Sequence, residues 1–364
     1  MNAPASLSTL STTPLATLLA GETEPFCGVL TPRQLDAPER EWEALTAASA
    51  VHDLGWLRRF AVQGEDRFRW LNGMVTNTVE ALAANTGAWN LVLNAQGRIQ
   101  GDLTVWREGD GPEADSLELE IAADQSEKLL AHLDHFIIMD DVELKPLREE
   151  TAIGLAGPNA ASVLKALGLS VPVAPFSRQR VIWKGNSLLV ERLYGVQVEH
   201  YALWVKPEAL AELWKTLLAA GVVAVGSTSL EALRIAEAIP VYEIDMVERD
   251  LPQETSQMRA LHFDKGCYQG QEIVERIRSR GNVHFHLRQI ELDGPLPDAG
   301  VELSYRKTDG SVAAAGKITS AIELPTGLRL ALAMIRAEAE IRPQPLLYAE
   351  KGRAQVLSAP PALR

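Results

Sequence analysis

The chain is poor in cysteine: its 364 residues include only Cys27 and Cys267. Two cysteines cannot form the disulfide framework of a small secreted domain, so we expect Cys267 to be a free thiol. No apolar run approaches the roughly 18–20 residues that a membrane helix needs. The N-terminus also lacks the basic start and compact apolar stretch of a signal peptide. These absences favour a cytoplasmic protein with no membrane partner.

The chain also lacks an excess of positive charge, since its net charge is −13. This charge disfavours non-specific binding to nucleic acid, which depends on cations that neutralise phosphates. Cations gather only between Lys265 and Arg288, where acidic residues interrupt them. We interpret that stretch as a surface of mixed charge.

Common phosphate and metal motifs are missing. There is no glycine-rich loop of the Walker or dinucleotide type, and no His-Glu-x-x-His. His284 and His286 share one face of an expected strand, but two imidazoles do not make a metal site. We therefore predict that the protein holds no metal.

Two similar strand-then-helix units are expected in the first 280 residues. Strands are predicted at 90–94, 102–106 and 117–121, because these runs alternate or carry branched residues. Asp124, with Glu127 three residues later, is predicted to cap the helix that follows. The second unit has a strand at 201–205 and a helix that begins at Pro207 and ends at Gly221.

The pattern changes after about residue 281. Short strands are predicted at 286–292, 301–305, 316–320, 328–335 and 354–357, with Gly and Pro between them, which is typical of a small antiparallel barrel. We predict a mobile tail at 1–22 with a short helix near 14–20, α+β units at 23–145 and 146–280, and a barrel at 281–364.

The segment 263–276 gathers chemically active residues between two glycines. Gly266 and Gly270 allow a ligand to approach the backbone, and Lys265 could lower the pKa of the Cys267 thiol. Gln271 and Glu272 offer groups that suit a flat heteroaromatic ring such as a pterin. The alternative is a turn bounded by glycines before a helix at 271–280, ended by Gly281. That alternative explains the glycines but not the residues between them.

This segment, Lys265-Gly266-Cys267-Tyr268-x-Gly270-Gln271-Glu272, resembles the signature of the YgfZ family of folate-binding proteins. Further blocks resemble those that this family shares with the aminomethyltransferases, such as the T protein of the glycine cleavage system. They are Val51–Leu54, Gly64–Asp66, Trp70–Gly73 with Thr76-Asn77, Leu93–Ile99 with Asp102, Leu233–Pro240, Gly316–Ser320 and Leu330–Ile335.

The resemblance implies an α+β fold, with two α+β domains and a C-terminal antiparallel β-barrel in a ring around a channel that accepts folate. It implies tetrahydrofolate, or another reduced folate, as the cofactor. It gives catalytic roles to Cys267 and to Asp102, which matches the aspartate beside the reactive folate nitrogen. It places Lys265, Gly266, Tyr268, Gly270, Gln271 and Glu272 at the folate.

The resemblance also implies two further folate contacts. Arg234 matches a basic position that could pair with the glutamate tail of folate. Glu199 lies near a pterin-binding glutamate of the aminomethyltransferases, although most glycines of that loop are missing here.

Three functions follow from these patterns. The first is a tetrahydrofolate-binding protein of the YgfZ type, which supports iron–sulfur enzymes, including those that thiolate transfer RNA. The second is a tetrahydrofolate-dependent aminomethyltransferase or demethylase, favoured by Asp102. The third is a scaffold that binds no folate. Whether the protein turns over a substrate stays open between them.

Overall fold

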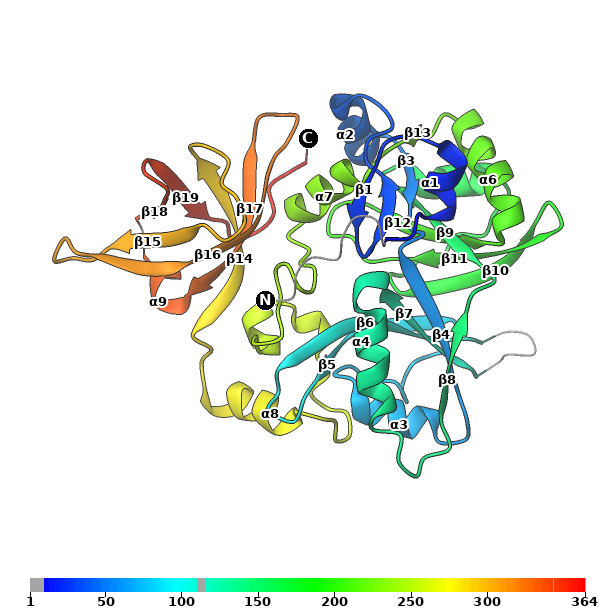
Figure 1. Cartoon of the computed structure of the whole chain (residues 1–364), viewed down its shortest axis with the longest axis horizontal. Helices are drawn as coiled ribbons and strands as arrows, with labels where there is room; N and C mark the ends of the chain where they lie inside the picture. The colour runs from blue at the N-terminus through cyan, green and yellow to red at the C-terminus, as the bar shows by residue number, and fades with distance from the viewer. Residues whose placement is uncertain (1–9, 110–114, 343, 364) are drawn as a thin grey trace.

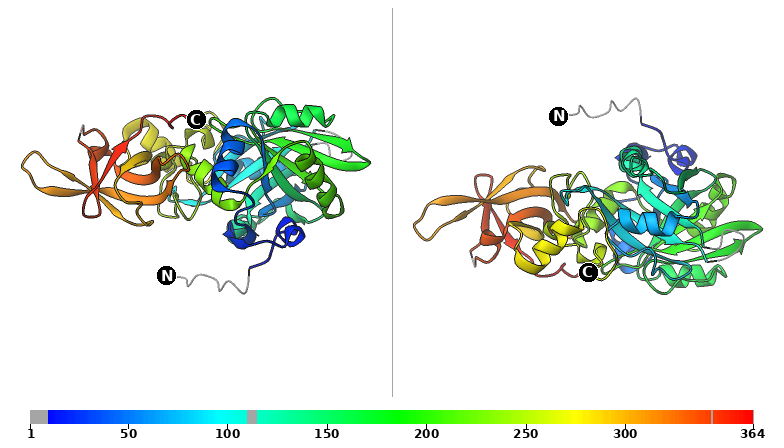
Figure 2. Two further views of the ribbon diagram at one scale, coloured as in Figure 1. Left: turned by 90° about the horizontal axis from the view of Figure 1, so that it is seen from above. Right: turned by 90° about the horizontal axis from the view of Figure 1, so that it is seen from below.

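Three lobes surround the centre of the molecule. The computed structural model describes residues 10–109, 115–342 and 344–363. A barrel forms one lobe, and the two halves of a large sheet with their helices form the other two (Figure 1). Viewed along the plane of this arrangement, the barrel lies at one end of the long axis and the sheet at the other (Figure 2). The predicted α+β fold with a C-terminal antiparallel barrel is confirmed.

The large sheet has 11 strands in the order β13-β3-β9-β12-β11-β10-β5-β6-β7-β4-β8. One register pair, Ser177 with Thr86, joins its halves. The strands are β3 (Ala50–Asp53), β4 (Leu57–Gln63), β5 (Thr86–Leu93), β6 (Ile99–Arg107), β7 (Leu117–Ala122), β8 (Glu143–Leu147), β9 (Thr151–Ala156), β10 (Ser177–Trp183), β11 (Asn186–Arg192), β12 (His200–Val205) and β13 (Val223–Ala224). A separate hairpin joins β1 (Thr23–Phe26) to β2 (Val29–Pro32).

Helices pack apolar faces on the two halves. In α6, Leu210, Leu213, Trp214 and Leu217 are buried at helical spacing, as the sequence predicts. The helices are α1 (Pro14–Leu19), α2 (Pro38–Ala47), α3 (Arg67–Met74), α4 (Ala123–Asp134), α5 (Ala160–Ala166), α6 (Pro207–Ala219), α7 (Ser227–Ala236), α8 (Gln271–Arg280) and α9 (Ala337–Glu340), with short 3₁₀ turns η3 (Pro252–Thr255) and η4 (Met258–Ala260).

The barrel closes in the order β14-β17-β16-β15-β18-β19. Its strands are β14 (Phe285–Asp293), β15 (Glu302–Arg306), β16 (Val312–Glu323), β17 (Arg329–Arg336), β18 (Leu346–Tyr348) and β19 (Gly352–Val356). The sequence patterns missed β18, because three residues are too few to show an alternating pattern.

The predicted tail differs from the structure beyond its first residues. Residues 1–9 lie outside the described part of the chain, but Leu15 of α1 is buried in the core. Thr13 caps α1 by accepting a hydrogen bond from the Ala16 N–H at 3.1 Å, and it donates a short hydrogen bond to Asp53. The segment from Thr13 to Leu19 is therefore part of the folded body.

The start of α4 also differs from the predicted capping box. Asp124 lies inside the helix, and no side chain caps it. Backbone carbonyls do so instead: the Ala123 N–H donates to the Trp56 carbonyl at 3.0 Å and the Asp124 N–H to the Cys27 carbonyl at 3.2 Å. The turn of the β1–β2 hairpin thus closes the helix N-terminus.

The two halves of the sheet are not continuous in sequence, unlike the predicted units 23–145 and 146–280. Strand β3, from the first predicted unit, pairs with β9 and β13 of the second half. Conversely, Tyr268 and Val274, from the second predicted unit, pack with Leu91 and Leu93 of β5. Long-range packing of this kind leaves no local mark in the sequence.

Candidate functional site

The signature segment, residues 265–272, is anchored to the first half of the sheet by Lys265. Its ammonium donates to the backbone carbonyls of Asn72 at 2.6 Å, Val75 at 2.7 Å and Asn77 at 2.6 Å. Burial lowers the pKa of Lys265 to about 7. The cation predicted to activate Cys267 is therefore committed to the 72–77 loop.

The backbone of Gly270, in the same segment, packs closely against another part of the protein rather than against a ligand. Its φ is +80°, and a Cβ there would lie 2.7 Å from the Asn94 carbonyl oxygen and 3.0 Å from the Gly97 Cα. A Cβ on Gly266 would meet nothing nearer than the Asn72 Nδ2 at 3.9 Å. Gly270 is thus required for packing of the α8 N-terminus on the 94–97 turn.

The other signature residues face different surroundings. Tyr268 is buried in the core, and its backbone N–H donates to Gln271 Oε1 at 3.3 Å. Cys267, Gly266 and Glu272 are exposed. The folate contacts predicted for these residues, and the catalytic role of Cys267, stay predictions.

Asp102 is held by three hydrogen bonds at the start of β6. Its Oδ2 accepts from Trp89 Nε1 at 2.8 Å, and its Oδ1 accepts from Gln125 Nε2 at 3.0 Å. Its backbone N–H donates back to Gln125 Oε1 at 3.0 Å. Burial raises the pKa of Asp102, while the two side-chain donors and the charge of Arg259 oppose that rise.

Arg259 lies in the same place, between two aromatic rings. Its guanidinium carbon is 3.6 Å from the ring centroid of Tyr194 and 4.7 Å from that of Trp89. Its Nε is buried without a hydrogen-bond partner in the described structure. We call Trp89, Asp102, Gln125, Tyr194 and Arg259 the Asp102 group.

The second cysteine also lies close to this group. Cys27, at a φ of +45° in the turn of the β1–β2 hairpin, contacts the start of α4 through its carbonyl. Burial, and then the negative charge of Asp124, raise the pKa of the Cys27 thiol well above its ordinary value. Asp102 acts in the same direction from farther away. The thiol therefore stays protonated, unlike that of a nucleophilic cysteine.

Arg234 is paired within the protein. Its guanidinium pairs with Glu231 at 2.5 Å and with Asp245 at 2.7 Å, and it donates to Ser320 Oγ of the barrel at 2.9 Å. A further bond goes to the Ile239 carbonyl at 3.2 Å. These partners use its donors to join α7 to the barrel, and the folate-tail contact that the resemblance implies for Arg234 stays a prediction.

Glu199 is likewise paired within the protein. Its Oε1 accepts from Arg192 at 3.0 Å and its Oε2 from the Tyr201 hydroxyl at 3.4 Å. The pterin contact that the resemblance implies for Glu199 stays a prediction. The nearby loop is instead held by buried Glu237, whose Oε1 accepts from the N–H groups of Gln197 at 2.6 Å and Val198 at 2.7 Å.

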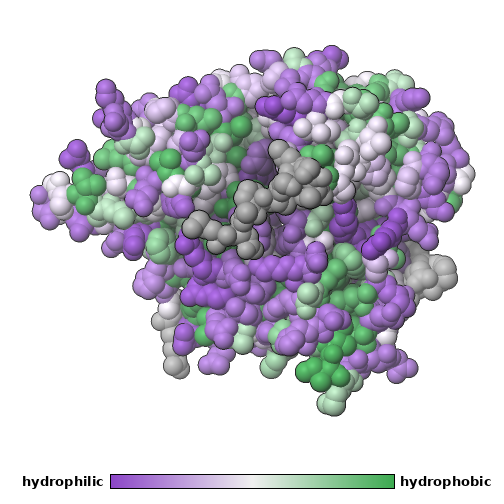
Figure 3. Space-filling view, in the orientation of Figure 1, coloured by the Kyte–Doolittle hydropathy of each residue, from purple (hydrophilic) through white to green (hydrophobic). Residues whose placement is uncertain are grey.

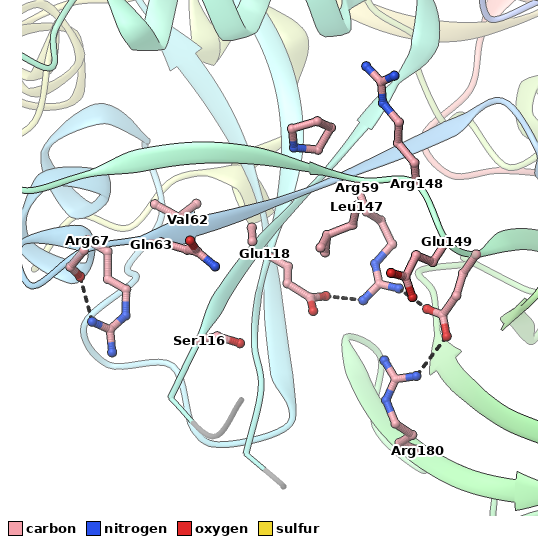
Figure 4. A pocket seen from close by; sticks show the side chains of 14 residues that line it. Arg59, Val62, Gln63, Arg67, Ser116, Glu118, Leu147, Arg148, Glu149 and Arg180 are labelled. Carbon is pink, nitrogen blue, oxygen red and sulfur yellow. Dashed lines mark hydrogen bonds and ion pairs between the residues drawn. The ribbon is translucent and has the colours of Figure 1, made fainter. Parts of the chain in front are cut away.

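The surface has a hydrophilic hollow near the centre of the view in Figure 3. A separate cavity of about 610 Å³ lies between β4, β8 and β10, and it is lined by Arg59, Glu118 and Arg180 among others (Figure 4). Arg59 pairs with Glu118 and Glu150 beside this cavity, and Arg178 of β10 pairs with Glu118 of β7 at 2.7 Å, which joins the two halves of the sheet. None of the predicted site residues lines this cavity.

Neither a metal-binding cluster nor a membrane-spanning helix is present in residues 10–109, 115–342 and 344–363. They contain no group of three or more His, Cys, Asp or Glu side chains placed to hold a metal ion. No helix in these ranges is long and apolar enough to cross a membrane.

Comparisons with known proteins agree with this architecture. The chain is 26% identical over 359 residues to an aminomethyltransferase of Nostoc sp., covering 95% of this chain and 93% of that protein. It is also 26% identical to an aminomethyltransferase of Shouchella clausii, with 93% of each covered. The crystal structure of glycine cleavage system aminomethyltransferase T from Bartonella henselae has the same fold, with a TM-score of 0.84 at 17% identity, over 96% of this chain and 97% of that one.

The family comparison covers most of the region that carries the Asp102 group. Residues 19–265 match the model described as the GCVT N-terminal domain. These residues include every member of the Asp102 group and stop within the signature segment. The chain therefore belongs to the GCVT family.

Proposed function

We propose that the protein binds a reduced folate, tetrahydrofolate, beside Asp102 and transfers a one-carbon unit there, as an enzyme of the aminomethyltransferase type. The observation that carries this proposal is the setting of Asp102: a half-buried carboxylate held by Trp89 and Gln125, with Arg259 close by. The relatives named aminomethyltransferase support it, since the match runs through nearly the whole chain. The proposed compartment remains the cytoplasm, on the sequence grounds given above.

The residues of the Asp102 group suit such a ligand. The rings of Trp89 and Tyr194 each carry Arg259 over one face, and the opposite face of each ring would suit a flat heteroaromatic ligand. The Asp102 carboxylate could take a proton from an amine or stabilise positive charge that develops on a nitrogen. Its two hydrogen-bond donors fix its orientation, and both oxygens keep lone pairs for a further contact.

The test is the variant D102N, which keeps the shape of the side chain and removes its charge. We expect methylenetetrahydrofolate formation from an aminomethylated carrier protein to fall by roughly 10²- to 10⁴-fold. Tetrahydrofolate binding, followed by tryptophan fluorescence, should change far less, because the ring contacts remain. Trp89 supplies the signal, since its indole touches Asp102.

Two outcomes would contradict the proposal. A wild-type protein with no fluorescence response to tetrahydrofolate would favour the scaffold without folate. Unchanged turnover in D102N would remove Asp102 from the chemistry. The matched control is S126A, which removes a hydroxyl that donates to the Ala123 carbonyl at 3.0 Å and should leave turnover as it is.

A second candidate function is the YgfZ-type support of iron–sulfur enzymes, including those that thiolate transfer RNA. The exposed thiol of Cys267 within the signature segment favours it, because an accessible thiol can react with a partner protein. In a deletion strain, C267A should then fail to restore iron–sulfur enzyme activity, although the protein accumulates normally. Full rescue by C267A would contradict this role.

A further inference from the structure

Two arginines near the centre of the molecule differ in how their charge is balanced. Arg234 has two carboxylate partners, Glu231 at 2.5 Å and Asp245 at 2.7 Å. Arg259 has no carboxylate partner within 4.0 Å among the described residues: Tyr194 forms a hydrogen bond with it, and Asp102 and Glu237 act on it from farther away. Arg259 is therefore the cation that could still accept an ion pair.

The surroundings of Arg259 favour an added ion pair with a ligand. Its guanidinium lies over the rings of Tyr194 and Trp89, while its Nε has no hydrogen-bond partner among the described residues. Burial lowers the pKa of Arg259, so the surroundings penalise its charge. A partly desolvated guanidinium without a counterion favours a ligand that brings a carboxylate, which it can bind through two parallel hydrogen bonds.

Arg259 also has a fixed place relative to Asp102. The indole of Trp89 donates to Asp102 and stacks against Arg259. The Asn77 side chain donates to the Arg259 carbonyl at 3.0 Å and to the Trp89 carbonyl at 3.3 Å, so it joins the two backbone segments. A ligand held at Asp102 would thus lie within reach of the guanidinium.

We infer that Arg259, rather than Arg234, binds a carboxylate of the glutamate tail of the folate. This inference rests on the proposed function, because it takes a reduced folate as the ligand of the Asp102 group. In a reduced folate, the glutamate supplies the carboxylates. Arg259 is then a binding residue that distinguishes ligands with the tail from ligands without it.

The experiment compares tetrahydrofolate with tetrahydropteroate, which lacks the glutamate. The wild type should bind tetrahydrofolate roughly 10-fold or more tightly than tetrahydropteroate. R259M should weaken binding of tetrahydrofolate by about 10- to 100-fold and that of tetrahydropteroate by less than about 3-fold. R259K keeps the positive charge but loses the two parallel N–H donors of the guanidinium. Its affinity for tetrahydrofolate should lie between those of the wild type and R259M.

The matched control is R336M. Arg336 also stacks on an aromatic ring, 4.9 Å from the centroid of Phe285, but it lies at the end of β17 in the barrel. R336M should leave both affinities unchanged. Each variant is compared by the ratio of its affinities for tetrahydrofolate and tetrahydropteroate. Partial unfolding of R259M would affect both affinities equally, so it would not change this ratio.

The outcomes separate this inference from the proposed function. Equal losses for both ligands in R259M, or no loss for either, would overturn the role of Arg259 while leaving folate binding intact. A wild-type protein that binds both ligands equally would do the same. A wild-type protein that binds neither would overturn the proposed function and this inference together.

Discussion

The signature segment and the Asp102 group use their polar residues in opposite ways. In the signature segment, the ammonium of Lys265 donates hydrogen bonds to three backbone carbonyls, and Gly270 packs against the 94–97 turn. In the Asp102 group, Arg259 has no carboxylate partner among the described residues, and burial raises the pKa of Asp102. Polar groups that find partners within the protein stabilise the fold, whereas the uncompensated charge of Arg259 favours a ligand that brings a carboxylate.

The two regions are nevertheless connected through one loop. Lys265 binds the Asn77 carbonyl, and the Asn77 side chain binds the carbonyls of Arg259 and Trp89. The signature segment therefore helps to position the Asp102 group without touching its carboxylate. The segment therefore has an anchoring role, beside the folate contacts that stay predicted for it.

The strongest test of this comparison is K265M, which removes the charge and keeps the length of the side chain. Three carbonyl oxygens would lose their donor, so we expect the free energy of unfolding to fall by about 3–5 kcal/mol. Urea titration measures that change. Binding of tetrahydrofolate should weaken as well, because the 72–77 loop is released.

The control for K265M is C267S, two residues away and exposed. It should change the free energy of unfolding by less than about 0.5 kcal/mol. If K265M were as stable as C267S, the signature segment would not have the anchoring role described here.

A second test compares the two glycines of the signature segment. G270A combines a left-handed backbone with a Cβ that would lie 2.7 Å from the Asn94 carbonyl oxygen, so we expect a loss of about 2–4 kcal/mol. G266A meets no atom closer than 3.9 Å and should stay within about 0.5 kcal/mol of the wild type. Thermal and urea unfolding of the pair measure the difference. Equal stabilities would mean that Gly270 serves a ligand and not the fold.

Sequence patterns predicted the fold because its elements are periodic. The apolar face of α6, the strands β5 to β7 and most barrel strands leave regular marks that need no tertiary information. Other elements, among them β4 and β8 to β11, were not predicted from the sequence. Two further departures have local causes: β18 is too short, and α4 is capped by carbonyls instead of by Asp124.

The Asp102 group could be predicted only in part. Asp102 followed from the family resemblance, but Trp89, Gln125, Tyr194 and Arg259 come from four different segments. Their spacing in the sequence carries no signal, because the sheet and the η4 turn bring them together. Arg234 is the reverse case: the family motif marks its position, but its ion pairs with Glu231 and Asp245 have no signal in the sequence.

The smallest expected effect concerns the pH dependence of the proposed turnover. Asp102 must be ionised to act as a base, so activity falls as the pH drops through the pKa of Asp102. Burial raises that pKa, and the hydrogen bond from Gln125 opposes the rise. In Q125L the opposing bond is lost, so the pKa rises further and the acid limb of the pH profile moves to higher pH. A lost bond of about 1 kcal/mol corresponds to a shift of ~0.5–1 pH unit.

The control is S126A, on the same helix, which should leave the acid limb of the pH profile in place. An unmoved acid limb in Q125L would show that Gln125 does not control the charge of Asp102.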